Sequence, residues 1–169
     1  MLRGVNVGGK RSLDMARLKG ICEAIGLSRV RTYIQSGNVV FESAETNVQA
    51  LENRIGEKIK KALGLEVAVV IRTKAELGQV VRDCPFAGKD TSKLHVTFLS
   101  SEPVVVPLNE LAKAKTCQEE FSVSGKEVYL YCPDGYGRTK LSNSFFEKKL
   151  KVLATTRNWN TVNKLLAMA

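Results

Sequence analysis

The chain has 169 residues, of which 44% are apolar and 25% are charged, and its formal net charge is +9. These proportions are ordinary for a globular protein and exclude an intrinsically disordered chain. No apolar run approaches the roughly 18 residues that a membrane-spanning helix needs, and the first residues lack the pattern of a signal peptide. We therefore expect a cytoplasmic protein, with no membrane partner, that forms one sizeable domain or two small ones.

The first 72 residues predict helices and strands in the order β-α-β-β-α-β, which is that of a ferredoxin-like unit. Apolar residues at helical spacing identify the two helices, and runs of β-branched residues identify the strands. The elements are a strand at 1–7, a helix that Asp14 opens and Gly26 ends, strands at 30–35 and 38–43 around a Ser36-Gly37-Asn38 turn, a helix at 47–63 and a buried strand at 66–71.

The second half repeats this pattern. "YIQSGNVVF" and "FSVSGKEVYL" both place a Ser-Gly turn between an aromatic-led strand and a strand of Val and aromatic residues. We therefore expect an α+β protein of two ferredoxin-like subdomains, at 1–72 and 73–169, that arose by internal duplication and end in a C-terminal helix. The elements of the second half are a short helix at 74–82, a strand at 93–99, a helix at 108–115, a hairpin at 120–132, a helix with Ser144 in a capping box and Phe146, Leu150 and Leu153 on one face, a very short strand at 154–156, and a final helix with Trp159, Val162, Leu165 and Leu166.

The cysteines and the single histidine do not form a recognisable metal or catalytic motif. Cys22, Cys84, Cys117 and Cys132 are scattered without a C-x-x-C pair, so we expect buried free thiols, no metal site and no cofactor. His95 alternates with the apolar residues of its strand-like run, which favours a structural or surface histidine over a catalytic one.

Both ends of the chain carry an excess of positive charge. The net charge is +5 over residues 3–31 and +6 over residues 138–164. Such charge attracts a phosphorylated small molecule, a nucleic acid or an acidic protein partner. The alternative is a solvated surface that only keeps the protein in solution.

The stretch "RGVNVGGKR" at residues 3–11 is a candidate anion site. It matches neither the P-loop nor the dinucleotide-binding pattern, but glycines before a helix can direct backbone N–H groups at an anion. We expect it to lie beside the Ser36-Gly37 turn; alternatively, its glycines only turn the chain. The candidate residues here are Arg3, Asn6, Gly8, Gly9, Lys10, Arg31, Gln35, Ser36 and Asn38.

A second candidate anion site lies in "TTRNWNTVNKL" at residues 155–165. Arg157, Asn158 and Asn160 cluster at the expected start of the last helix, where an anion would oppose the positive end of the helix dipole. We expect Arg138 and Lys140 to share this site. The alternative is a helix that packs through its apolar face, with Asn158 as its N-cap.

Three long stretches together resemble the DUF1697 family of bacterial proteins. They are "LRGVNVGGK" at 2–10, "RTYIQSGNVVF" at 31–41 and "TTRNWNTVNKL" at 155–165, and "IRTKAEL", "CPF" and "VYLYCPDGYGRTKL" add to the match. The resemblance implies two α+β subdomains and does not imply an activity.

The sequence favours a module that binds an anionic, phosphate-bearing ligand. An enzyme acting on such a substrate, with arginine and asparagine as electrostatic stabilisers, is the second hypothesis. A structural or protein-partner role is the third. Base stacking as in an RRM domain has only Phe41 and Tyr33 to support it.

Overall fold

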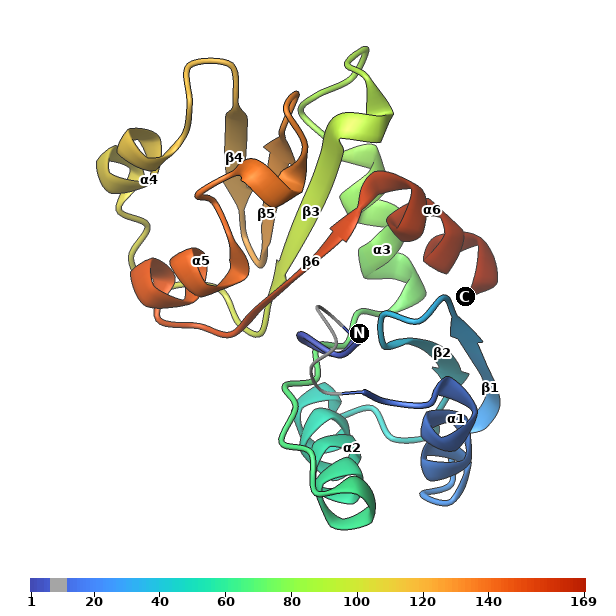
Figure 1. Cartoon of the computed structure of the whole chain (residues 1–169). Helices are drawn as coiled ribbons and strands as arrows, with labels where there is room; N and C mark the ends of the chain where they lie inside the picture. The colour runs from blue at the N-terminus through green and yellow to red at the C-terminus, as the bar shows by residue number, and fades with distance from the viewer. Residues whose placement is uncertain (7–11) are drawn as a thin grey trace. The chain divides into compact units, whose positions relative to one another are not determined.

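The computed structural model describes residues 1–6 and 12–169 and has an α+β fold (Figure 1). These residues contain six α-helices and two antiparallel sheets. They form two compact units, the first comprising residues 1–71 with 167–169 and the second residues 72–166. No helix among the described residues is long and apolar enough to cross a membrane.

The first unit contains two helices and a β-hairpin. Its elements are α1 (Met15–Glu23), β1 (Ser28–Tyr33), β2 (Asn38–Glu42) and α2 (Val48–Leu63). The side chain of Asp14 caps α1 by accepting a hydrogen bond from Ala16 N at 2.7 Å, and Asn47 caps α2 in the same way. α2 ends at Gly64, whose φ of 67° suits glycine. The helices and the hairpin of the first half are therefore confirmed.

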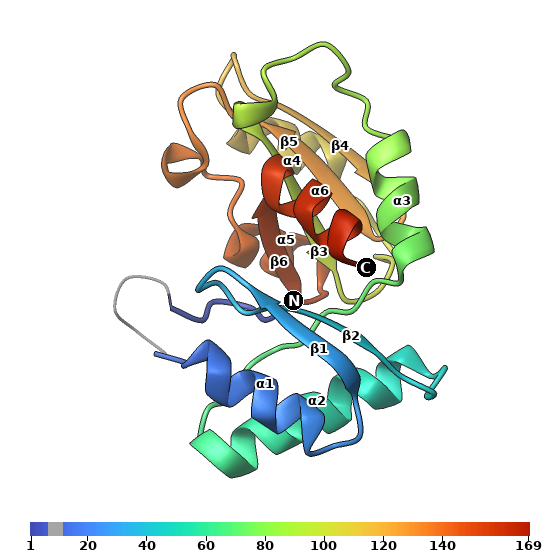
Figure 2. The same cartoon turned by 90° about the vertical axis from the view of Figure 1, so that its right-hand side faces the viewer.

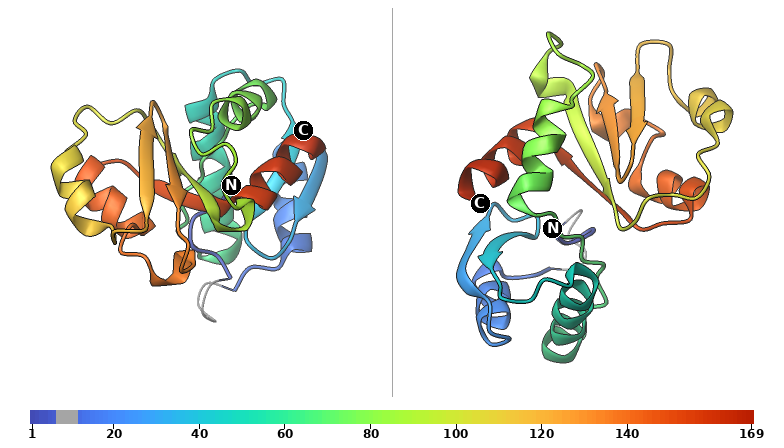
Figure 3. Two further views of the ribbon diagram at one scale, coloured as in Figure 1. Left: turned by 90° about the horizontal axis from the view of Figure 1, so that it is seen from above. Right: turned by 180° about the vertical axis from the view of Figure 1, so that it is seen from behind.

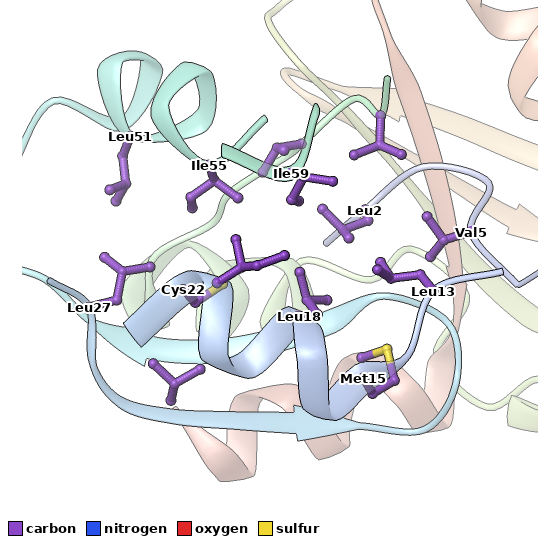
Figure 4. Packing of buried hydrophobic residues seen from close by; sticks show 14 residues of the cluster. Leu2, Val5, Leu13, Met15, Leu18, Cys22, Leu27, Leu51, Ile55 and Ile59 are labelled. Carbon is purple, nitrogen blue, oxygen red and sulfur yellow. The ribbon is translucent and has the colours of Figure 1, made fainter. Parts of the chain in front are cut away.

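The core of the first unit lies between the two helices and the hairpin (Figure 4). Leu18 and Cys22 on α1 meet Ile55 and Ile59 on α2, and Leu2 and Val5 of the N-terminal segment close one end. Phe41 is partly buried and packs against this core.

The expected strands at 1–7 and 66–71 are reduced to a single antiparallel bridge between Leu2 and Val69. The backbone cannot stay extended after Leu2, because Gly4 and Asn6 have φ angles of 65° and 55°. The sheet of the first unit therefore has two strands within the described residues.

The second unit contains a four-stranded antiparallel sheet with helices on both faces (Figures 2 and 3). α3 and α6 cover one face, and α4 and α5 cover the other. The strands follow the order β4-β5-β3-β6. The elements are α3 (Lys74–Arg82), β3 (Leu94–Leu99), α4 (Leu108–Ala114), β4 (Glu120–Ser124), β5 (Glu127–Tyr131), α5 (Asn143–Leu150), β6 (Ala154–Asn158) and α6 (Trp159–Met168), whose last two residues belong to the first unit.

Each face of this sheet is buried. Leu99, Val128 and Leu130 pack with Leu111 of α4 and Phe146 of α5 in one cluster. On the other face, the Tyr129 hydroxyl donates to the Val80 carbonyl of α3 at 3.1 Å. An RRM domain stacks bases on an open sheet face, and the sheet of the second unit is covered by helices on both faces.

Two expectations for the second half are wrong in detail. α5 begins two residues earlier than expected, because Ser142 rather than Ser144 is the N-cap, accepting from Phe145 N at 3.3 Å. The helix ends where Lys151 has a φ of 59°, so Leu153 lies beyond it and is half exposed. β6 is also longer than the expected strand at 154–156, since it pairs with β3 along its whole length.

The two halves share an order of elements but differ in their sheets. The hairpin turn between β1 and β2 spans residues 34–37, whereas only Gly125 and Lys126 join β4 to β5. The described sheet of the first unit has two strands, whereas that of the second unit has four. This difference leaves the internal duplication as a prediction.

Candidate ligand-binding site

The N-terminal candidate site has polar side chains that support the local backbone. The side chain of Asn6 donates to Leu13 O at 2.8 Å and accepts from Leu13 N at 2.7 Å. Gly8, Gly9 and Lys10 lie outside the described residues, so their place beside the Ser36-Gly37 turn stays a prediction. The flanking Leu2 does reach that turn, where its N–H donates to Gly37 O at 2.9 Å.

The hairpin residues of this candidate site also form hydrogen bonds that support the local backbone. Asn38 is fully buried and donates to Ser36 Oγ at 2.8 Å and to Tyr33 O at 3.3 Å, which fixes the turn. Arg31 donates to the Met168 carbonyl, and the main-chain N–H of Arg3 donates to Ala68 O. Gln35 is exposed. The described contacts of Asn6 and Asn38 therefore favour structural roles.

Arg157 is buried on β6 and lies on the α3 and α6 face of the sheet. It pairs with Val96 in the register of β3 and β6, and its guanidinium donates to Thr155 Oγ1 at 2.9 Å and Thr156 O at 2.8 Å. Burial lowers the pKa of Arg157 to about 10, which leaves it charged at neutral pH. This arginine belongs to the sheet rather than to the start of the last helix.

The structure separates Arg157 from its two neighbouring asparagines. Asn158 is the next residue on the strand, so its side chain points to the opposite face. It caps α6 by accepting from Thr161 N at 2.8 Å, as the alternative interpretation predicts. Asn160 is exposed in the first turn of the helix.

A cluster of hydroxyl and amide groups lies on the α4 and α5 face of the sheet. Thr156 Oγ1 of β6 donates to Asn143 Oδ1 at 2.6 Å and accepts from the Tyr136 hydroxyl at 3.0 Å. It also lies 2.7 Å from Thr97 Oγ1 of β3. Because the single hydroxyl proton of Thr156 goes to Asn143, Thr97 is the donor in that contact.

His95 joins this cluster through its ring. The imidazole stacks on the phenol ring of Tyr136, with centroids 4.9 Å apart and planes 23° apart. Its Nδ1 lies 3.3 Å from the Lys93 carbonyl. Burial lowers the pKa of His95, and the contact with Lys93 opposes this, so the histidine is neutral at pH 7.

The cluster holds the loop that carries Arg138 and Lys140. We call residues 134–142 the Tyr136 loop; it contains a 3₁₀ turn, Tyr136–Arg138, and leads into α5. Tyr136 fixes one end on the sheet, and the fully buried Leu141 fixes the other. Arg138 and Lys140 lie between these anchors and are exposed. These two predicted cations thus lie on the Tyr136 loop, whereas Arg157 lies on the other face of the sheet.

Sequence reasoning missed most of the cluster. Thr97, Tyr136, Asn143 and Thr156 come from four separate segments, and only the pairing of β3 with β6 and the packing of α5 bring them together. Of these four residues only Thr97 and Thr156 lie on strands, where the alternation of side chains between the two faces was the available signal. No group of metal-ligating side chains occurs among the described residues. Cys22 and Cys132 are buried as expected, Cys84 is partly buried, and Cys117 is exposed, which corrects the expectation for that thiol.

Comparison with known proteins defines the family of the chain. The family model described as "Protein of unknown function (DUF1697)" matches residues 1–129. The chain belongs to the DUF1697 family. Of the cluster, His95 and Thr97 lie within the matched range, and the Tyr136 loop lies beyond it. None of the curated proteins matches this DUF1697 chain.

One solved structure has a similar fold over nearly the whole chain. It is that of the conserved bacterial protein SP0830 from Streptococcus pneumoniae, with a TM-score of 0.70 and 19% sequence identity. The match covers 99% of the DUF1697 chain and 95% of the other chain. At this identity the similarity supports the fold alone.

Proposed function

We propose that the second unit binds a phosphate-bearing small molecule, such as a nucleotide, at the Tyr136 loop. The observation that carries the proposal is the anchoring of Arg138 and Lys140 between Tyr136 and Leu141. Cations on a fixed loop lose less conformational freedom on binding than cations on a mobile one. Arginine also offers a planar set of donors that matches a phosphate group.

Neighbouring groups support an anionic ligand. The Nδ2 of Asn143 is a donor at the first residue of α5, where the partial positive charge of the helix is concentrated. The partly buried rings of His95 and Tyr136 add apolar surface beside the cations. Asp134 is the carboxylate of the Tyr136 loop, so the loop still carries a net positive charge. A ligand with both a phosphate and a planar base fits these features.

Calorimetric titration with AMP, inorganic phosphate and a short single-stranded oligonucleotide tests the proposal. We expect Arg138→Ala to weaken AMP binding by about 10-fold to 100-fold, since a charged hydrogen bond contributes about 1.5–3 kcal/mol. Lys148→Ala is the matched control, because it removes an exposed cation from the last turn of α5. We expect it to change AMP affinity by no more than about twofold, since an exposed charge that makes none of the proposed contacts is screened by salt.

The other results distinguish the remaining hypotheses. Equal losses in both variants, together with tight binding of the oligonucleotide, would contradict a defined site and indicate attraction of polyanions by net charge. Conversion of AMP during the titration would favour the enzyme hypothesis. No binding of any probe would exclude the proposed function.

A further inference from the structure

One ring nitrogen of His95 is open to solvent within the cluster. Nδ1 faces the Lys93 carbonyl, so the neutral ring carries its proton there and Nε2 has a free lone pair. Among the described residues, every fully buried side-chain nitrogen or oxygen has a hydrogen-bond partner. Nε2 of His95 has no hydrogen-bond partner among the described residues. It is therefore not a fully buried atom and must reach solvent.

The surroundings of this nitrogen favour an anion. The residues opposite His95 on the neighbouring strands, Leu130 on β5 and Asn158 on β6, are uncharged. The buried Cys132 thiol has its pKa raised to about 11 by burial and stays neutral. The His95 ring contacts Tyr136 and the main-chain carbonyl of Lys93, and the segments of these two residues also carry Asp134, Arg138, Lys140 and the Lys93 side chain. Burial of the ring lowers the pKa of His95, so the free ring is neutral at pH 7, and an anion at Nε2 would favour its protonated form.

We propose that His95 contacts the phosphate group of the ligand through Nε2 and takes up a proton from solvent when the ligand binds. The inference rests on the proposed function and adds a third cationic contact to Arg138 and Lys140. The neutral imidazole becomes an imidazolium, whose Nε2–H donates to a phosphate oxygen, while Nδ1–H keeps its bond to Lys93. Tyr136 holds the ring in place by stacking.

This assignment fixes the direction of the pH dependence. A ligand that prefers the protonated ring raises the histidine pKa in the complex. Affinity then falls as pH rises between the free and bound pKa values, by at most about 10-fold for each pH unit. Sulfate is a suitable probe beside AMP, because it remains a dianion throughout this range.

The chain has one histidine, so proton NMR reports its ring without any assignment step. The experiment follows the imidazole Cε1 proton of the full chain from pH 4.5 to 9, free and with saturating AMP or sulfate. We expect the pKa of free His95 to lie below the ordinary range and to rise by about one unit or more in each complex. His95→Gln keeps a donor but cannot titrate, so its sulfate affinity should lose this pH dependence.

Two results would overturn the inference in distinguishable ways. If AMP binds and Arg138→Ala weakens it, yet the pKa of His95 does not move, the phosphate contact is wrong and the proposed function stands. If neither probe changes the spectrum or the heat of titration, the proposed function and the inference both fail. Circular dichroism of His95→Gln confirms that the variant is folded, which leaves the pH profile as the deciding measurement.

Discussion

Gly37 of the hairpin turn lies in close contact with Leu2 and Val5 of the N-terminal segment. A Cβ atom added there would lie 2.5 Å from Val5 Cγ2 and 2.7 Å from Leu2 Cβ, and the φ of Gly37 is 72°. We expect Gly37→Ala to lower the free energy of unfolding by about 2–4 kcal/mol, which combines the left-handed backbone with overpacking. Urea denaturation monitored by circular dichroism measures this change.

Gly26→Ala is the matched control for the backbone contribution. Gly26 has a φ of 83°, but an added Cβ would meet no atom within 4 Å. Its cost should therefore be only that of the left-handed conformation, about 1–2 kcal/mol. Equal costs at the two positions would mean that Leu2 and Val5 move aside without penalty.

At the scale of single residues, the sequence predicted local roles better than long-range ones. Asp14 and Asn158 are helix caps because their side chains reach backbone groups two or three residues away. Arg157 could not be placed in this way. Its position depends on pairing with Val96, which is 61 residues distant, and that pairing directs it to the face opposite Asn158.

At the scale of elements, the capping box at the start of α3 makes stability depend on pH. Glu76 accepts from Thr73 N and pairs with Lys126 of the β4–β5 turn at 2.8 Å. Partial burial raises the pKa of Glu76, but the bonds from Lys126 and Thr73 outweigh it and hold the pKa below its ordinary value. The folded state thus gains stability from ionised Glu76 above the ordinary carboxyl pKa and loses it as pH falls through the lowered one.

Glu76→Gln tests this dependence. Glutamine preserves the capping box but removes the charge that faces Lys126. We expect a loss below about 1 kcal/mol at pH 7, because the pair is more than a third exposed, and no difference from wild type near pH 2.5. Melting temperatures of both proteins across this range measure it. A difference that persists at low pH would show that packing, and not charge, is responsible.

Element positions were predictable where the signal was local. α2 and α3 match their predicted ranges within one residue, since apolar periodicity and caps define both ends. The strand at 1–7 failed because two left-handed residues interrupt it. β6 was underestimated because a polar run, Thr155 to Asn158, becomes a strand only through its partner β3. Strand pairing over long sequence distances is therefore the information that the sequence pattern lacked.

At the scale of the whole molecule, charge was predictable and the candidate site was only partly so. The excess of positive charge over residues 138–164, to which Arg138 and Lys140 contribute, can be counted directly from the sequence. The supporting cluster joins residues 95, 97, 136, 143 and 156, and the contact between Tyr136 and Thr156 alone spans 20 residues. A hydrophobic pattern identifies apolar faces, and it gives no weight to hydroxyl groups on a strand. The cluster therefore became visible only in the folded chain.

Each unit has a core of its own, which predicts that local stability changes stay within one unit. Phe146 of α5 is fully buried in the second unit, and Phe146→Ala should remove about 3–5 kcal/mol through the cavity it leaves. We expect amide hydrogen exchange, measured by mass spectrometry of peptides, to accelerate within residues 72–166 and to be unchanged within 12–71. Leu18→Ala, in the core of the first unit, is the reciprocal control and should reverse this pattern. Faster exchange in both units from either substitution would show that they unfold as one cooperative body. In that case, a loss of ligand binding in a Tyr136-loop variant would have to be interpreted together with the stability of the whole chain.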